Sequence, residues 1–167
     1  MEKPRYYFTE GNDKVNLDFS KLDFSYISCP YRFEAVYEYG VWRVRGLLEG
    51  SSMEIPEGSQ CLHYGQQLFE GMKAQAGPDG AVYAFRPYDN ARRMNAGARY
   101  LRGPEVPEEL FVRGIEEVVA ANLPYVPPFG SGAGCPSSTG TRWTARRTTA
   151  RTAPHTMPMS ASRPTTA

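Results

Sequence analysis

The sequence predicts an α+β domain in which helices flank an antiparallel sheet. Residues 31–48 and 72–85 each hold two strand-like runs separated by turn residues, which is the pattern of a β-hairpin. Residues 87–101 and 107–122 instead place apolar side chains at helical spacing. Hairpins pair antiparallel strands, and helices with one apolar side need a surface to cover. This combination is typical of an α+β fold.

The two predicted hairpins differ in their turns. The first joins the runs RFEAVYEY and VWRVRGLL, with Gly40 between them as the turn residue. The second joins residues 72–76 and 81–85 through a PDG sequence at residues 78–80, and these residue types favour tight turns. We interpret the first hairpin as a structural element without chemistry of its own.

Three helices are expected around the hairpins. The first begins near Ser59, a residue type that caps helix N-termini, and runs to about Phe69. The second opens at Pro87, in a position where a missing N–H costs little. The third begins after Pro107 and ends before Pro124, with acidic residues in its first turn. On the second helix, the side chains expected in solvent are Arg92, Asn95 and Arg99.

Composition and charge argue against several classes of function. The 167 residues allow one domain, and the net charge of +1 indicates no nucleic-acid partner. No apolar run is long enough to span a membrane, and residues 1–20 lack the features of a signal peptide. The cysteines, Cys29, Cys61 and Cys135, lack metal-ligand spacing and are few, as in a reducing compartment. We therefore expect a cytoplasmic protein without a metal site.

Residues 62–93 combine residue types that suit an anionic, ring-bearing ligand. Tyr64 and Phe69 offer aromatic surface, while the nearby glycines allow close approach of the backbone. Arginines follow near the start of the second predicted helix, and the planar fork of arginine suits phosphate and carboxylate. From the residues alone, this stretch is an α+β segment that could bind an anion.

The strings LHYGQQLFEGMKA and FRPYDNARRM, separated by the PDG turn, also resemble the N-terminal part of branched-chain amino-acid aminotransferases. These are fold-type IV enzymes that use pyridoxal 5'-phosphate (PLP). The resemblance covers about residues 21–133, and the two motifs are specific in combination. It implies the small domain of that fold. It also implies transfer of the amino group of leucine, isoleucine or valine to 2-oxoglutarate, a step of amino-acid biosynthesis.

The resemblance implies roles for three residues. Arg93 matches an arginine that contacts the PLP phosphate, and Tyr64 and Phe69 match residues that line the pocket for the apolar side chain of the substrate. Without the resemblance, the two aromatics would be interpreted as core residues. His63 is best interpreted as a residue that packs or makes one hydrogen bond, and Arg92 as an ordinary surface charge.

No residue of this chain is expected to be catalytic. In the family, a strand with a tyrosine and an arginine near the substrate carboxylate leads into a larger domain, whose lysine forms the Schiff base with PLP. Neither is present here, and Lys73 belongs to the FEGMKA motif. We therefore expect a truncated, inactive fragment with weak or no PLP binding, from a family that is homodimeric. The lysines of the chain are Lys3, Lys14, Lys21 and Lys73.

Residues 134–167 are expected to form a disordered tail. They include no Leu, Ile, Val, Phe or Tyr, so they cannot bury enough apolar surface to offset the entropy lost on ordering. Of these 34 residues, 31 are types whose codons have C or G at the second base, as expected if a GC-rich gene is translated out of frame. The alternative is a basic arm that binds nucleic acid, because five arginines occur without an acidic residue.

The predicted organisation is an extension (residues 1–20), a small domain (21–133) and the tail (134–167). Two classes of function remain open: a damaged part of an aminotransferase, or a non-catalytic module such as a pseudoenzyme or partner-binding domain. D-amino-acid transaminases and aminodeoxychorismate lyases share the fold-type IV architecture. The string HYGQQLFEGMKA favours the branched-chain group over both.

Overall fold

The computed structural model describes residue 18, residues 27–130 and the backbone of residues 142–145. The expectations for residues 1–20, and for most of 134–167, concern residues outside this part of the chain. The elements in order are β1 (Tyr31–Glu38), β2 (Val41–Glu49), α1 (Gln60–His63), β3 (Leu68–Gly71), β4 (Ala74–Ala76), β5 (Val82–Ala84), α2 (Pro87–Tyr100), α3 (Glu108–Ala121), the 3-10 turn η2 (Leu123–Tyr125) and β6 (Arg142–Ala145).

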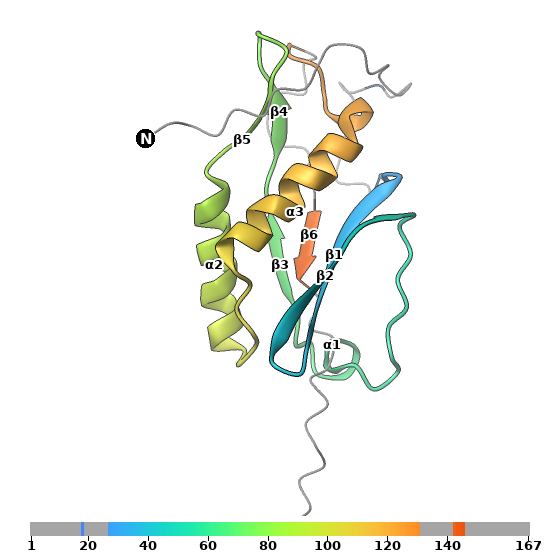
Figure 1. Ribbon diagram of the computed structural model, residues 1–167, viewed down its shortest axis with the longest axis vertical. Helices are drawn as coiled ribbons and strands as arrows, with labels where there is room; N and C mark the ends of the chain where they lie inside the picture. Colours follow the sequence, from blue (N-terminus) through green and yellow to red (C-terminus); the bar gives the residue numbers. More distant parts are fainter. Residues whose placement is uncertain (1–17, 19–26, 131–141, 146–167) are drawn as a thin grey trace, which may run out of the picture.

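The expected α+β fold, with antiparallel strands and flanking helices, is confirmed. Within the described residues the strands pair as β1–β2, β3–β6 and β4–β5, and each pair is an antiparallel two-stranded sheet. Figure 1 shows α3 crossing the strands diagonally, with α2 beside them. Helix α2 contacts α3 and β3, while α3 also contacts β1 and β2, and residues of β4 and β5 share one core with both helices.

The first hairpin forms at its predicted place. Its connection consists of Tyr39 and Gly40, which both have positive φ, at 51° and 86°. A two-residue loop with this backbone has the twist that antiparallel strands require, and glycine adopts it without strain. The register shifts between Glu34 and Ala35, opposite Gly46, whose φ is 78°. This irregularity is a β-bulge that bends the hairpin.

The second hairpin is also confirmed, although its strands are shorter than predicted. Strands β4 and β5 flank the PDG turn, in which Gly80 has a φ of 77°. The Asp79 carboxylate accepts hydrogen bonds from the Tyr83 hydroxyl and the Ala81 N–H, at 2.5 and 3.2 Å. The turn residues therefore hold the turn through a side chain as well as through backbone conformation.

The first predicted helix is wrong over most of its length. Helix α1 covers only Gln60–His63, and Phe69 lies on strand β3. Gly65 adopts a φ of 61°, a left-handed conformation that commonly ends helices. Ser59 does precede the helix, but its side chain makes no capping hydrogen bond and its hydroxyl is buried.

The second and third helices begin and end close to the predicted positions. Pro87 opens α2, and α3 carries Glu108 and Glu109 in its first turn. Their buried sides enclose the core together with residues from β4, β5 and the connecting loops. The core residues are Met72, Ala74, Val82, Ala91, Met94, Val106, Phe111, Val112, Ile115, Val119, Leu123 and Val126.

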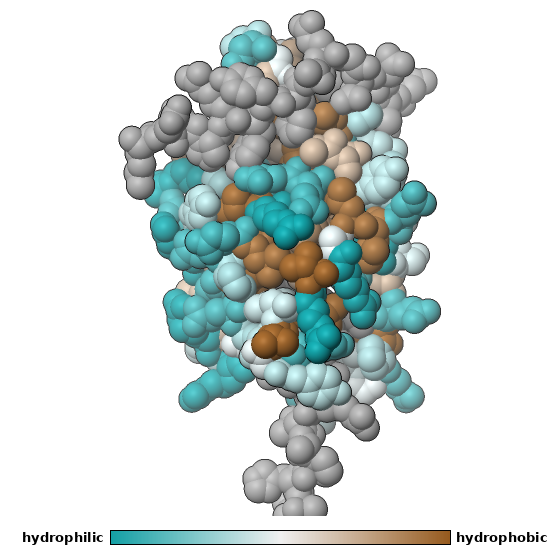
Figure 2. Space-filling model, viewed as in Figure 1, coloured by the Kyte–Doolittle hydropathy of each residue, from teal (hydrophilic) through white to brown (hydrophobic). Residues whose placement is uncertain are grey.

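Hydrophobic surface also remains on the outside of the molecule. Figure 2 shows apolar residues gathered in the middle of the visible face, where α3 crosses the strands, with hydrophilic residues around them. The exposed aliphatic side chains of the described residues include Val41, Val44 and Leu47 on strand β2. Polar side chains surround this patch, so it is limited in extent.

Two asparagines link segments that are distant in the chain. The predicted solvent position of Asn95 is wrong: it is 6% exposed, and its amide both donates to the Val106 carbonyl and accepts from the Val106 N–H, each at 2.8 Å. Asn122 does the same for Tyr31, donating to its carbonyl at 2.9 Å and accepting from its N–H at 3.2 Å. The loop at Val106 and the start of β1 at Tyr31 do not provide partners for these backbone groups, so the asparagine side chains provide them.

Strand β6 lies inside the range expected to be without structure. It pairs with β3 over four residues, from Leu68 opposite Ala145 to Gly71 opposite Arg142. The apolar content of residues 142–145 does not predict this strand. Pairing with β3 requires only an extended backbone and an open strand edge, and it does not depend on apolar side chains. The rest of the expected tail lies outside the described residues.

We predict that Asn95→Ala lowers the free energy of unfolding by about 3 kcal/mol, because it leaves the N–H and the carbonyl of buried Val106 without partners. Urea denaturation followed by circular dichroism measures the loss. Arg92→Ala is the control, since Arg92 is an exposed residue of the same helix in surface ion pairs and should cost less than about 1 kcal/mol. Equal losses for the two variants would contradict the role assigned to Asn95.

Candidate functional site

The centre of the candidate site is an ion pair between strand β3 and helix α2. Glu70 lies on β3 and is 4% exposed. Arg93 on α2 donates to both of its carboxylate oxygens, from Nε to Oε2 at 2.9 Å and from Nη2 to Oε1. Asn90, also on α2, donates from Nδ2 to Oε1 at 2.9 Å and to the Gly71 carbonyl at 3.1 Å. One buried carboxylate therefore receives three donors from one helix.

The periodicity of the two elements explains why these residues meet. In a strand successive side chains alternate between faces, so Glu70 is buried while its neighbours Phe69 and Gly71 are exposed. On a helix residues three apart lie on the same side, so Asn90 and Arg93 both reach β3. Contacts between α2 and β3 are among the helix–strand contacts that hold the domain together.

The electrostatics of the pair are asymmetric. The side chain of Glu70 is 5% exposed and that of Arg93 is 67% exposed. A buried carboxylate needs both a counter-charge and hydrogen bonds, and Arg93 with Asn90 supplies them. In return, the hydrogen bond and the negative charge of Glu70 raise the pKa of Arg93 above its ordinary value. Arg93 is thus a permanent cation that is fixed at its inner side and open to solvent at its outer side.

Arg92 has a different environment from that of its neighbour. Its side chain is 61% exposed, and it pairs with Asp89 at 3.1 Å and with Glu108 at 3.2 Å, both on the surface. The structure agrees with its interpretation as an ordinary surface charge. The two adjacent arginines therefore provide a matched pair for mutagenesis.

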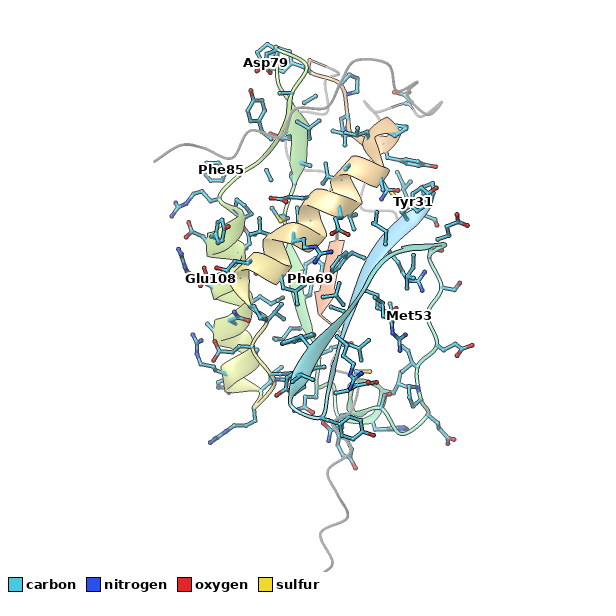
Figure 3. The ribbon with its side chains drawn as sticks, in the orientation of Figure 1. Tyr31, Met53, Phe69, Asp79, Phe85 and Glu108 are labelled. Atoms are coloured by element: carbon cyan, nitrogen blue, oxygen red, sulfur yellow. The ribbon has the colours of Figure 1, made fainter. Side chains whose placement is uncertain are left out.

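The two predicted pocket aromatics do not form a closed pocket in the described part of the chain. Tyr64 follows α1 and is 83% exposed, and Phe69 is 62% exposed. Phe69 lies midway along the molecule on β3, well away from Asp79 at the tip of the second hairpin (Figure 3). Its ring lies over Gly71, where an added Cβ would be 3.3 Å from the ring. Phe69 precedes Glu70 on β3 but is exposed where Glu70 is buried, and Tyr64 lies before the strand begins.

His63 makes structural contacts of the kind expected of it. Its Nε2 is 2.7 Å from the Glu57 carbonyl, and its ring meets Tyr64 edge-on with centroids 6.5 Å apart. No carboxylate or nucleophile accompanies it among the contacts of the described residues. The geometry gives His63 no chemical task.

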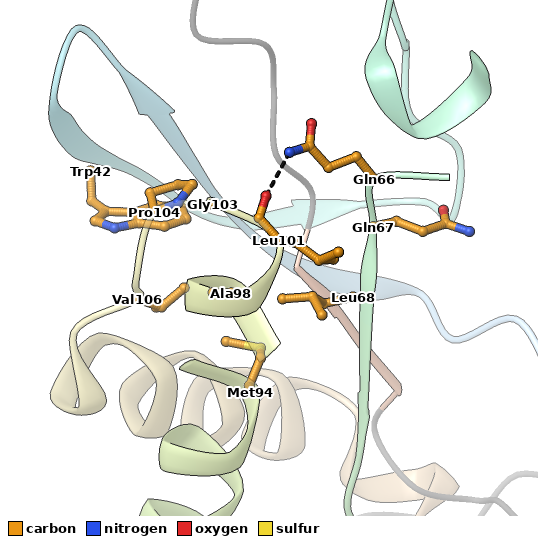
Figure 4. Close-up of a pocket in the computed structure, with 10 residues that line it drawn as sticks. All are labelled: Trp42, Gln66, Gln67, Leu68, Met94, Ala98, Leu101, Gly103, Pro104 and Val106. Atoms are coloured by element: carbon orange, nitrogen blue, oxygen red, sulfur yellow. Dashed lines mark hydrogen bonds between the residues drawn. The ribbon is translucent and has the colours of Figure 1, made fainter. Parts of the chain in front are cut away.

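A small apolar cavity lies elsewhere, between the end of α2 and the loop that follows it (Figure 4). Its volume is about 40 Å³, and Trp42, Leu68 and Met94 are among the residues that line it. Gln66 donates to the Leu101 carbonyl at 2.8 Å beside the cavity. The residues that line it include no charged side chain. Neither Arg93 nor the two pocket aromatics line it.

Other kinds of site are not found in the described part of the chain. No three His, Cys, Asp or Glu side chains there are grouped so that they could share a metal ion. None of the helices described is both long and apolar enough to cross a membrane. Lys73 is the only lysine in these ranges, and it is half-buried between β3 and β4. The described part of the chain therefore offers a positively charged side chain, Arg93, with no reactive amine among its recorded contacts.

Sequence reasoning did not identify Glu70 and Asn90 as functional residues. Both belong to the motif strings LFEGMKA and FRPYDNARRM, but no property of either residue type predicts its burial or its partner. The positions of the two residues were the available signal. Glu70 in the first motif and Asn90 in the second can face each other only if the first motif forms a strand. The incorrect helix prediction for Phe69 removed that signal.

Known proteins resemble this chain over its N-terminal part. No family model matches it. It is 50% identical over 118 residues to a branched-chain-amino-acid aminotransferase of Haemophilus influenzae, covering 71% of this chain and 34% of that protein. It is 42% identical over 118 residues to the enzyme of the same name from Helicobacter pylori, covering 71% of this chain and 35% of that protein. A chloroplastic branched-chain amino acid aminotransferase 2 of Humulus lupulus is 32% identical over 126 residues, 75% of this chain and 31% of that protein.

The resemblance inferred from the two motifs is thus confirmed by whole-segment similarity. The chain spans about a third of the length of the relatives that it matches. The similarity concerns the part of the chain that contains β3, α2 and the Glu70–Arg93 pair.

We predict that Arg93→Ala lowers the free energy of unfolding by about 1–3 kcal/mol, because it leaves the buried Glu70 carboxylate without its cation. Arg92→Ala should cost less than about 1 kcal/mol. Adding Glu70→Gln to Arg93→Ala should restore part of the loss, since an uncharged amide is cheaper to bury than a carboxylate. Thermal or urea unfolding of the three variants is the measurement, and a double variant no more stable than Arg93→Ala would contradict the explanation.

Proposed function

We propose that this chain is the small-domain part of a branched-chain-amino-acid aminotransferase, and that in the whole enzyme Arg93 contacts the phosphate of PLP. The similarity to enzymes of that name, at up to 50% identity, supports the first part. The second part rests on one observation: Arg93 is a cation fixed on its inner side by Glu70 and exposed on its outer side. A fixed and open guanidinium is what a phosphate group with nearly two negative charges requires.

The residues present fit one portion of the cofactor. The outer side of Arg93 can donate to phosphate oxygens. When bound, PLP supplies the electron sink that allows an amino group to be transferred. The task of this chain is then to hold and orient the phosphate end. Lys73 belongs to the FEGMKA motif, so we expect none of the described residues to bind the cofactor covalently in the way that the family lysine does.

The exposed aromatics support a role in selecting the substrate side chain. Tyr64 and Phe69 present large apolar surfaces to solvent, which is costly unless another segment or a ligand covers them. A pocket formed by these two aromatics and completed by the larger domain would favour leucine, isoleucine or valine through shape and apolar contact. The proposed reaction exchanges an amino group between these amino acids and 2-oxoglutarate.

Several further properties follow from the family proposal. They are a homodimeric assembly, a cytoplasmic location, a place in amino-acid biosynthesis and a small domain bounded at about residues 21–133. Within fold-type IV enzymes, the names of the relatives favour the branched-chain group over D-amino-acid transaminases and aminodeoxychorismate lyases. We infer that residues 134–167 are out-of-frame sequence, on the grounds of their composition.

A non-catalytic module is the second candidate, because strand β6, within the compositionally unusual residues, is paired with β3. Resequencing the gene distinguishes the two candidates. A frame-restoring base followed by a lysine-bearing domain would support the aminotransferase. An unbroken reading frame that stops after the present residues would support the module.

We predict that the purified 167-residue chain does not transaminate leucine with 2-oxoglutarate. The expected reason is that it lacks the lysine and the second half of the substrate pocket. A coupled glutamate assay measures turnover, and peptide mapping after treatment with PLP and borohydride measures whether one lysine is labelled selectively. The active control is a frame-restored protein. Turnover that follows the purified chain through chromatography would show that the proposal of an inactive fragment is wrong.

A further inference from the structure

The donors of Arg93 are divided between two edges of its guanidinium plane. Nε and Nη2 form one edge, and both donate to the carboxylate of Glu70. A guanidinium carries five N–H donors, so two are used there and three remain at Nη1 and on the outer side of Nη2. Among the hydrogen bonds of the described residues, Glu70 is the only acceptor for Arg93. The remaining donors belong to a side chain that is 67% exposed.

The Glu70 carboxylate is itself held in place. It accepts from Asn90 as well as from Arg93, and Asn90 also binds the Gly71 carbonyl, which ties the amide to the backbone of β3. The carboxylate lies on the buried side of the strand, where its motion is restricted by packing. A two-point pair with such a partner fixes the plane of the guanidinium as well as its position.

We propose that Glu70 is a positioning residue: it occupies the inner edge of Arg93 so that the outer edge presents a planar pair of donors to an oxyanion such as phosphate. This inference rests on the proposed phosphate contact of Arg93 and adds the group that orients it. Glu70 itself does not touch the anion. Its negative charge lies on the far side of the guanidinium, where the cation separates it from the ligand.

The proposal differs from simple charge neutralisation in what it requires at position 93. Neutralising Glu70 needs only a positive charge, and an ammonium group provides one. Serving two anions on opposite edges needs the planar fork of arginine, because the three donors of a lysine share one nitrogen, which the buried carboxylate would draw toward itself and away from a second anion. Arg93→Lys therefore separates the two explanations while it keeps the charge that the buried carboxylate needs.

The experiment uses the 167-residue chain and inorganic phosphate as the probe. NMR spectra of ¹⁵N-labelled protein follow the Arg93 Nε–H in the absence of phosphate, and the amides around Asn90 and Arg93 during a phosphate titration. We expect slow exchange of the Nε–H in the wild type and fast exchange in Glu70→Gln. We expect phosphate affinity to fall about tenfold or more in Arg93→Lys. In Arg93→Lys with Glu70→Gln, affinity should return to within about threefold of the wild type, because the ammonium is released.

Arg92→Lys is the matched control, because Arg92 lies beside Arg93 but makes only surface pairs. It should leave both measurements unchanged. An unchanged Nε–H exchange rate in Glu70→Gln, or equal phosphate affinity in Arg93→Lys and the wild type, would overturn the positioning role while the phosphate contact of Arg93 still stood. A wild-type chain with no phosphate-dependent shift near Arg93 would overturn both. Circular dichroism of each variant verifies that the fold is retained.

Discussion

The burial of one carboxylate constrains this domain more than any other single feature. Glu70 is 4% exposed, and a carboxylate in that position is tolerated only if charged and polar donors reach it. The donors come from α2. This helix must therefore lie against β3 with a fixed rotation about its own axis and a fixed position along that axis. Once α2 is placed in this way, two of its buried residues, Ala91 and Met94, reach the core that α3 completes. The position of α2 therefore follows from an ionic requirement as well as from hydrophobic packing.

Local patterns in the sequence predicted most of the secondary structure. The two hairpins were predictable because glycine, proline and aspartate define their turns, and the two long helices because proline marks both of their starts. The helix predicted up to Phe69 failed because Gly65 takes a left-handed conformation, which a glycine permits but does not impose. Strand β6 was not predictable, since its pairing depends on the open edge of β3 rather than on its own side chains.

The candidate site was predictable only in part, for a similar reason. The motif was enough to propose a role for Arg93, and the residue type was enough to give its charge. The burial of Glu70 and the position of Asn90 depend on which faces of β3 and α2 meet, and a polar residue in a strand does not reveal its orientation. Asn95 shows the same limit: helical spacing alone placed it in solvent, whereas two backbone groups of Val106 hold it inside.

The pairing of Asn122 with Tyr31 has a consequence for synthesis of the chain on the ribosome. The two residues are 91 positions apart. The Asn122 side-chain amide binds the N–H and the carbonyl of Tyr31, the first residue of β1, as a peptide group of a neighbouring strand would. At ordinary translation speeds the later residue is made roughly 5–20 seconds after the earlier one. During that interval the start of β1 has unpaired backbone groups and no α3 to cover it. Nascent chains that stall before residue 122 would therefore be the forms most exposed to aggregation and to recognition by chaperones.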